Sequence, residues 1–273
     1  MSIKITDHIV RSYNKNGYVI LSIFNKNEID NLKKKIKKKA EIILKEKKWN
    51  LSLYHTYVDD NQNQKITDQK NRFINVDNKI INKLNKNRQI NSILKNKWKH
   101  SNFLLPDQKY LTGKIKKTSL KNIKKNEIPF RIVRPHKKNK YISAAPPPHV
   151  DVNATKVDKK KNKGQEYIGS SIQFTLWLPL IGFSKKYTLR LSPGSHKFNH
   201  PINTLQKNKK YVSSVFSKKY IEKFKFKRLN LKKGQAVLFD DNLIHGSSLN
   251  KGKITRISME FRLYNFNKVK LSK

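Results

Sequence analysis

Apolar residues return at helical spacing through the first third of the chain. From Asn25 to Trp49, an isoleucine, leucine or alanine recurs every three or four residues and lysine fills many of the other positions, which predicts a helix with one buried face. Asn25 or Asn27 can cap its start. The same spacing predicts a second helix from about Asp77 to Lys99, and Tyr18–Phe24 predicts a short strand before the first helix.

From about residue 128, the apolar residues come in short runs separated by turns, which is typical of β-strands. Helices followed by strands favour a single α+β domain that is mainly β, with residues 1–127 as a helical buttress and residues 128–273 as a barrel-like core. Two long basic segments, Asn153–Gly169 and Lys197–Lys223, interrupt the strands and are candidate lids or binding loops. The strands are expected at Pro129–Val133, His149–Val152, Ser171–Leu178, Leu189–Leu191, Lys227–Leu231, Ala236–Phe239 and Ile254–Phe266.

The formal net charge of +44 brings in a possible polyanionic partner, such as nucleic acid. Only nine of the 62 basic residues are arginine, however, and the lysines are spread along the whole chain. A nucleic-acid surface usually concentrates its charge and uses arginine for bidentate contacts. Dispersed lysine, together with abundant asparagine and isoleucine, is typical of the residue usage of an AT-rich genome. Affinity for polyanions stays open as the alternative.

The chain has no cysteine, which excludes disulfides, thiolate catalysis and zinc sites of the cysteine type. Histidine, aspartate and glutamate remain as metal ligands. No run of 18 apolar residues is present, and the N-terminus lacks the apolar segment of a secretory signal. We therefore expect a cytoplasmic protein without a membrane span.

A metal site is suggested by His149-Val150-Asp151, an H-x-D motif. On a strand, residues two apart point to the same side, so the imidazole and the carboxylate converge on one point. With one further histidine they form a 2-His-1-carboxylate triad, which leaves three adjacent metal positions open and suits Fe(II), a 2-oxo acid and dioxygen. By itself the motif is weak, because a surface histidine beside a surface aspartate gives the same pattern.

The second half of the candidate site begins with an apolar strand and a polar turn that lead into His245. Arg256 follows eleven residues later, on a predicted strand. A buried guanidinium needs an anionic partner, and a dicarboxylate co-substrate could supply one. The alternative is that Arg256 pairs with Glu260 across an exposed strand face. The polar residues that share this face are Arg256, Ser258, Glu260 and Arg262.

With these residues the chain resembles the phytanoyl-CoA dioxygenase-like family of Fe(II)/2-oxoglutarate-dependent oxygenases. The similar region covers roughly Pro129 to Phe266. The resemblance implies a double-stranded β-helix, a jelly-roll or cupin-like barrel, behind N-terminal helices. The motifs that carry it are the H-x-D, Trp-Leu-Pro-Leu at Trp177–Leu180, Leu-Arg-Leu-Ser-Pro-Gly-Ser-His-Lys at Leu189–Lys197, and His-Gly-Ser with an arginine at plus eleven.

The resemblance also implies roles for individual residues. His149, Asp151 and His245 would ligate Fe(II), and Arg256, assisted by Ser247, would bind the distal carboxylate of 2-oxoglutarate. The implied reaction consumes O2, releases succinate and CO2, and hydroxylates a small molecule such as a secondary metabolite, a sugar or an acyl compound. His196 is a rival third ligand, but no arginine stands ten to fifteen residues beyond it.

Other features leave alternatives open. Gln173, Thr175 and Trp177 share one strand face and could line the pocket or simply pack. Arg131 and Arg134 could meet substrate or co-substrate, or could form a solvated edge. The basic loops favour an anionic substrate.

Three other functions compete with this interpretation. One is a nucleic-acid demethylase of the same superfamily, because two arginines stand six apart on the last strand. The others are a non-catalytic β-barrel binding module and a zinc hydrolase with the same ligands, although a hydrolase gives no reason for Arg256.

Overall fold

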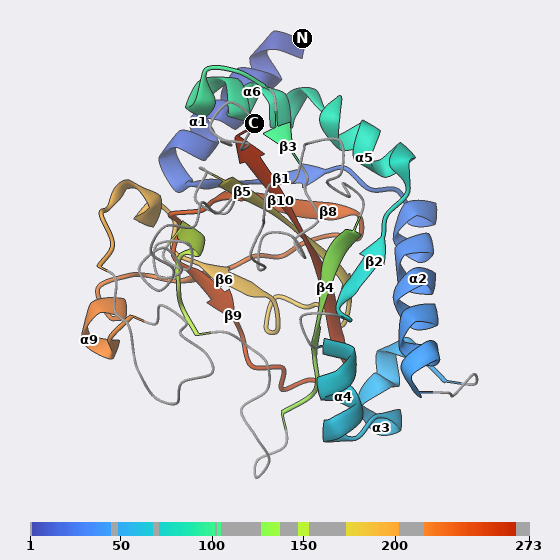
Figure 1. Cartoon of the computed structure of the whole chain (residues 1–273). Helices are drawn as coiled ribbons and strands as arrows, with labels where there is room; N and C mark the ends of the chain where they lie inside the picture. The colour runs from blue at the N-terminus through green and yellow to red at the C-terminus, as the bar shows by residue number, and fades with distance from the viewer. Residues whose placement is uncertain are drawn as a thin grey trace, which may run out of the picture.

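Two antiparallel sheets and a set of helices build the molecule (Figure 1). The structure is a computed structural model that describes residues 2–44, 49–67, 71–101, 103–104, 127–136, 147–152, 173–201 and 216–265. The basic segment Asn153–Gly169 lies outside the described residues, as does most of Lys197–Lys223. The second segment does contain a short helix, α9 (Lys218–Ile221).

The large sheet has the strand order β1-β8-β5-β10-β4-β2, and β3 pairs with β10. The small sheet has the order β7-β6-β9. The large sheet consists of β1 (Tyr18–Ser22), β2 (Phe73–Asn75), β3 (Phe103–Leu104), β4 (Glu127–Val133), β5 (Gln173–Ile181), β8 (Gln235–Asp240) and β10 (Arg256–Asn265). The small sheet consists of β6 (Leu189–Leu191), β7 (Lys227–Arg228) and β9 (His245–Ser247).

Helices lie along the top and the right side of the large sheet in Figure 1. The predicted first helix is α2, and Asn25 caps it, because its side chain accepts a hydrogen bond from the Glu28 N–H at 2.9 Å. The predicted second helix is instead two helices: the first ends at Asn85, and Asn87 caps the next by accepting from the Ile90 N–H at 3.0 Å. The helices are α1 (Ser2–Asn16), α2 (Lys26–Leu44), α3 (Tyr54–Tyr57), α4 (Asp60–Thr67), α5 (Asn78–Asn85) and α6 (Arg88–Trp98).

The period-two alternation of the central strands separates a helix-covered core from the interior between the sheets. On β10, Ile257, Met259 and Phe261 join the apolar core formed with the helices. The residues between them face the other way. A second apolar cluster joins Trp177 of the large sheet to Leu191 of the small sheet, so the two sheets pack against each other there.

Most predicted strands are confirmed, with shifted ends, but one needs correction. Residues 149–152 do not form a strand: His149 makes an isolated bridge, and Asp151 begins a helical turn. The N-terminal region contributes both edge strands of the large sheet, the predicted β1 and the unexpected β2.

No helix in the described ranges combines the length and the apolar composition that crossing a bilayer requires.

Candidate metal centre and co-substrate pocket

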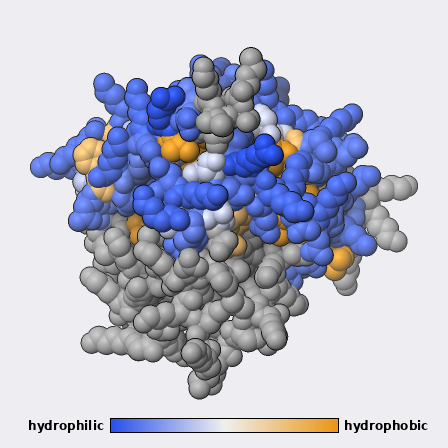
Figure 2. Space-filling view, turned by 90° about the horizontal axis from the view of Figure 1, so that it is seen from above, coloured by the Kyte–Doolittle hydropathy of each residue, from blue (hydrophilic) through white to orange (hydrophobic). Residues whose placement is uncertain are grey.

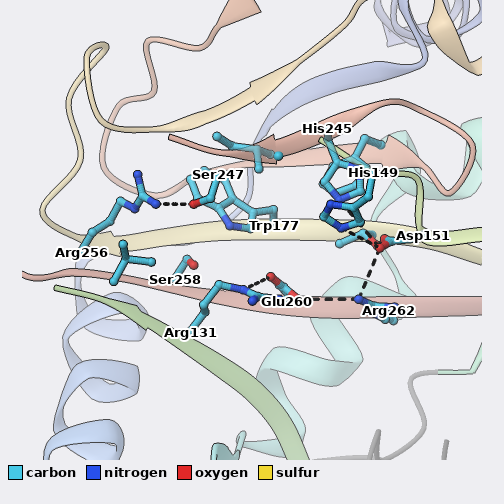
Figure 3. Close-up of a pocket in the computed structure, with 15 residues that line it drawn as sticks. Arg131, His149, Asp151, Trp177, His245, Ser247, Arg256, Ser258, Glu260 and Arg262 are labelled. Carbon is cyan, nitrogen blue, oxygen red and sulfur yellow. Dashed lines mark hydrogen bonds and ion pairs between the residues drawn. The ribbon is translucent and has the colours of Figure 1, made fainter. Parts of the chain in front are cut away.

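The structure brings His149, Asp151 and His245 together between the two sheets (Figure 3). One ligand atom from each residue lies within 4.8 Å of the other two. The Nε2 atoms of His149 and His245 are each 3.8 Å from Oδ1 of Asp151. Two imidazoles and one carboxylate directed at one point are a donor set that can hold a divalent transition metal. Among the described residues, these three are the group of His and acidic side chains that lie close enough together to share one metal ion.

Local backbone contacts position the three side chains. His149 and His245 face each other across an antiparallel bridge, and each N–H donates to the other residue's carbonyl at 2.9 Å. The H-x-D convergence therefore arises without the extended strand that the sequence predicted. The N–H of Val152 donates to the Asp241 carbonyl at 3.0 Å and fixes the turn that carries Asp151.

Gly246 permits this close approach of the chain to β9. A Cβ atom at Gly246 would lie 3.1 Å from the backbone N and Cα of Pro148, which is tighter than ordinary contact. A larger residue would therefore push away the segment that carries His149.

Hydrogen bonds to backbone carbonyls assign the histidine tautomers. Nδ1 of His149 lies 2.8 Å from the Pro147 carbonyl, and Nδ1 of His245 lies 3.0 Å from the Leu243 carbonyl. A carbonyl can only accept, so Nδ1 carries the proton and Nε2 presents its lone pair to the centre. Burial, reinforced by His245, lowers the pKa of His149 to about 4, which keeps this imidazole neutral at physiological pH.

Asp151 is 3% exposed and is nevertheless held ionised. Burial alone raises the pKa of its carboxyl group, but Arg262, His245 and His149 outweigh burial and leave the pKa well below its usual range. Arg262 Nη2 is 3.5 Å from Oδ1, and the Thr175 hydroxyl donates to Oδ2 at 2.8 Å. The carboxylate therefore has a fixed position before any metal arrives.

Arg256 is buried in the same pocket, with 2% of its surface exposed. Its Nη1 donates to the Tyr187 carbonyl at 3.0 Å, and its Nη2 donates to the Ser247 hydroxyl. Burial lowers the pKa of Arg256 to about 10, so it remains a cation at neutral pH. Within the described part of the chain, no carboxylate lies at ion-pair distance from it. Glu260, the partner considered from the sequence, pairs instead with Arg131 and Arg262.

The polar face of β10 forms one wall of the pocket, as the alternation predicted (Figure 3). Thr175 and Trp177 of β5 also line it, whereas the side chain of Gln173 is outside the described set. Arg131 faces the pocket, but Arg134 pairs with Asp60 at the protein surface. His196 belongs to neither the triad nor the pocket lining.

The sequence matches one known protein family over most of its length. The family model described as phytanoyl-CoA dioxygenase (PhyH) matches residues 13–258. The chain belongs to the phytanoyl-CoA dioxygenase family. No curated protein matches the sequence.

Several solved structures of enzymes that use iron or 2-oxoglutarate have the same fold as this chain. The epimerase SnoN, in complex with Fe³⁺, alpha-ketoglutarate and nogalamycin RO, is 11% identical with a TM-score of 0.54, over 96% of this chain and 84% of SnoN. EctD from S. alaskensis, with 2-oxoglutarate and 5-hydroxyectoine, is 15% identical with a TM-score of 0.52, over 97% and 78%. The carbocyclase SnoK from nogalamycin biosynthesis is 10% identical with a TM-score of 0.52, over 94% and 83%. Identities this low establish a shared fold.

Proposed function

We propose that this member of the phytanoyl-CoA dioxygenase family is an Fe(II)- and 2-oxoglutarate-dependent dioxygenase that hydroxylates a small molecule. The observation that carries the proposal is a buried guanidinium, Arg256, that has no carboxylate partner among the described residues and faces the same pocket as the His149–Asp151–His245 cluster. A buried cation of this kind is costly unless an anion joins it. A dicarboxylate with a metal-binding 2-oxo acid at its other end satisfies both groups.

The donor set fits ferrous iron. His149, Asp151 and His245 would be the ligands, with both Nε2 lone pairs free and Asp151 ionised. When bound, the metal and the 2-oxo acid supply the oxidising chemistry, in which dioxygen is reduced, 2-oxoglutarate becomes succinate and CO2, and a substrate C–H bond is hydroxylated.

The residues around the cluster bind and orient the co-substrate. The guanidinium of Arg256 offers a planar fork of donors to the distal carboxylate, and the Ser247 hydroxyl, which already contacts Arg256, stands beside it. Trp177, Leu189 and Phe239 line the same pocket and give it an apolar surface. The protein thereby fixes both ends of the dicarboxylate.

We further propose that the two sheets are the walls of a double-stranded β-helix and that residues 1–273 form one domain. Supporting this, both sheets are antiparallel and the His149–His245 bridge continues the small sheet beyond β9. The structural neighbours span nearly the whole chain.

For the substrate we propose a small, anionic molecule. The neighbours SnoN and EctD were crystallised with small molecules, nogalamycin RO and 5-hydroxyectoine. Arg131 faces the pocket and keeps part of its side chain accessible, although Glu260 occupies two of its donors. Its remaining N–H groups could bind an acidic substituent.

Succinate release from 2-oxoglutarate in the presence of Fe(II) and air tests the proposal. The wild type should form succinate, and His149→Ala should form none, because it lacks one metal ligand. His8→Ala is the matched control, since His8 is exposed on α1 and should leave turnover unchanged. Equal succinate release by all three proteins would contradict the proposal.

A further inference from the structure

The two oxygens of the Asp151 carboxylate have different surroundings. Oδ2 accepts the hydrogen bond of the Thr175 hydroxyl at 2.8 Å. Oδ1 faces both histidine Nε2 atoms, at 3.8 Å each, and has Arg262 Nη2 at 3.5 Å. One oxygen is therefore occupied by the protein, while the other is directed at the centre of the triad.

The two residues that hold Asp151 come from one register position of the large sheet. Arg262 on β10 pairs directly with Thr175 on β5, so their side chains emerge side by side on the pocket face. Thr175 is buried, which gives its hydroxyl a fixed direction. This cross-strand pair contacts both oxygens of one carboxylate. Figure 3 shows the Arg262 side chain directed at Asp151.

Arg262 is itself held by a series of alternating charges. Its Nη2 is 3.8 Å from Glu260 Oε2, and Arg131 donates to Glu260 from Nε at 2.9 Å and from Nη2 at 3.4 Å. Burial alone raises the pKa of Glu260, but Arg131 and Arg262 outweigh it and lower that pKa to about 2. Asp151, Arg262, Glu260 and Arg131 thus form a charged row along the pocket wall, and each member fixes the next.

We propose that Thr175 and Arg262 are positioning residues that make Asp151 a one-oxygen metal ligand, with Oδ2 retained by Thr175 and Oδ1 presented to the metal. The inference rests on the proposed function, because it assumes that the triad binds a metal. A carboxylate that bound through both oxygens would occupy a further coordination position. Holding it to one oxygen keeps three positions open for the 2-oxo acid and dioxygen.

Thr175 gives a cleaner test than Arg262. Arg262 positions the carboxylate but also repels a bound cation, so its removal changes metal affinity in two opposing directions. The Thr175 hydroxyl carries no charge, so its loss reports on positioning alone. Two pairs of variants isolate this hydroxyl: wild type against Thr175→Val, and Thr175→Ser against Thr175→Ala.

The experiment is titration of the full metal-free chain with Co(II), without 2-oxoglutarate or oxygen. Calorimetry measures the Co(II) affinity, and the absorption spectrum of bound Co(II) reports its coordination. We expect Thr175→Val and Thr175→Ala to bind Co(II) about tenfold or more weakly, with a changed spectrum as the carboxylate shifts its binding mode. Thr175→Ser should keep the wild-type spectrum and an affinity within about threefold of wild type, because serine retains the hydroxyl that donates to Asp151. Thr188→Val is the matched control, since the buried Thr188 hydroxyl has no hydrogen-bond partner in the described ranges and lies outside the pocket lining.

Two results would overturn the inference. Wild-type affinity and spectrum in both Thr175→Val and Thr175→Ala would show that the hydroxyl does not position Asp151, while leaving the proposed function intact. Failure of the wild type to bind Co(II) would overturn the proposed function and this inference together. If Thr175→Val does not fold, the comparison of Thr175→Ser with Thr175→Ala decides the outcome, because these two variants differ only in the hydroxyl.

Discussion

At the scale of single residues, the chemistry depends on which charges on β10 find partners. Residues four apart on a strand are separated by about 13 Å, and Arg256 and Glu260 form no ion pair along the strand. Arg131, on the adjacent β4, lies opposite Ser258 and reaches Glu260 diagonally. The charge of Glu260 is thereby balanced by its neighbours, and among the described residues Arg256 has only neutral partners, Tyr187 and Ser247.

This arrangement predicts a specific defect for Arg256→Gln. The variant should bind 2-oxoglutarate about 100-fold more weakly, a loss of about 2.7 kcal/mol, since truncating one partner of a buried charge pair typically costs about 2–5 kcal/mol. Arg256→Lys should lose about tenfold, because lysine keeps the charge but not the planar fork. Calorimetric titration of Mn(II)-loaded protein with 2-oxoglutarate measures both. Metal affinity without the co-substrate should stay at the wild-type value, and an unchanged co-substrate affinity in Arg256→Gln would argue against the assigned role.

The sequence predicted the meeting of His149, Asp151 and His245, because the H-x-D motif and the spacing from His245 to Arg256 form a recognisable pattern. It did not predict the partners of Arg131 and Arg262. Alternation shows which side chains share a face, but the register between strands decides which of them touch. That register is a property of the folded sheet.

At the scale of secondary-structure elements, two helices are tied to the turn that leads from β8 into β9. Tyr13 of α1 donates its hydroxyl hydrogen bond to Asp240 Oδ2, and Lys97 of α6 forms an ion pair with the same oxygen. Lys97 is also 3.8 Å from Asp241 Oδ1. Burial and the adjacent Asp240 raise the pKa of Asp241, so Lys97 is the cation that makes two neighbouring buried carboxyl groups tolerable.

Lys97→Met should therefore destabilise the protein. Removing one partner of a largely buried ion pair leaves an uncompensated charge, and we expect a loss of about 3 kcal/mol in the free energy of unfolding. Denaturant unfolding of the metal-free protein measures it. Lys95→Met on the same helix is the control, because Lys95 is exposed and should change stability by less than about 0.5 kcal/mol. Equal stability of the two variants would mean that Lys97 does not support this turn.

Helix and strand periodicity predicted most elements and failed at two informative places. The break between α5 and α6 depends on one side chain, Asn87, whose cap interrupts an otherwise continuous apolar pattern. The segment around His149 forms a single bridge, to His245 of β9, and is not an extended strand. This bridge requires the close approach of the chain that Gly246 permits. A contact between residues about a hundred positions apart leaves no local signal in the sequence.

At the scale of the whole molecule, the acidic residues are few and several of the 18 are inside. Asp151, Asp240 and Asp241 are buried, and Glu260 is mostly so. The described part of the face seen in Figure 2 is largely hydrophilic. In the described interior, acidic groups balance Arg131, Arg262 and Lys97, whereas Arg256 has no acidic partner there. No lysine of the described ranges is buried. Residue usage of an AT-rich genome stays the favoured interpretation of the charge, as a prediction.

The coarse architecture followed from the order of patterns along the chain. Helices first and strands afterwards predicted a mixed α+β protein, and this is confirmed. The antiparallel pairing of the sheets is a finding of the structure. The contribution of β1 and β2 to the sheet edges could not be predicted, because edge strands from the N-terminal region pair with β8 and β4, more than fifty residues away.

The central claim is that His149, Asp151 and His245 together hold one iron. Anaerobic titration of the metal-free protein with Fe(II) tests it most directly. We predict one Fe(II) per wild-type chain, and loss of this site in His149→Ala, Asp151→Ala and His245→Ala while each variant stays folded by circular dichroism. Undiminished binding of one Fe(II) per chain by the His245→Ala variant, or no binding by the wild type, would contradict the account.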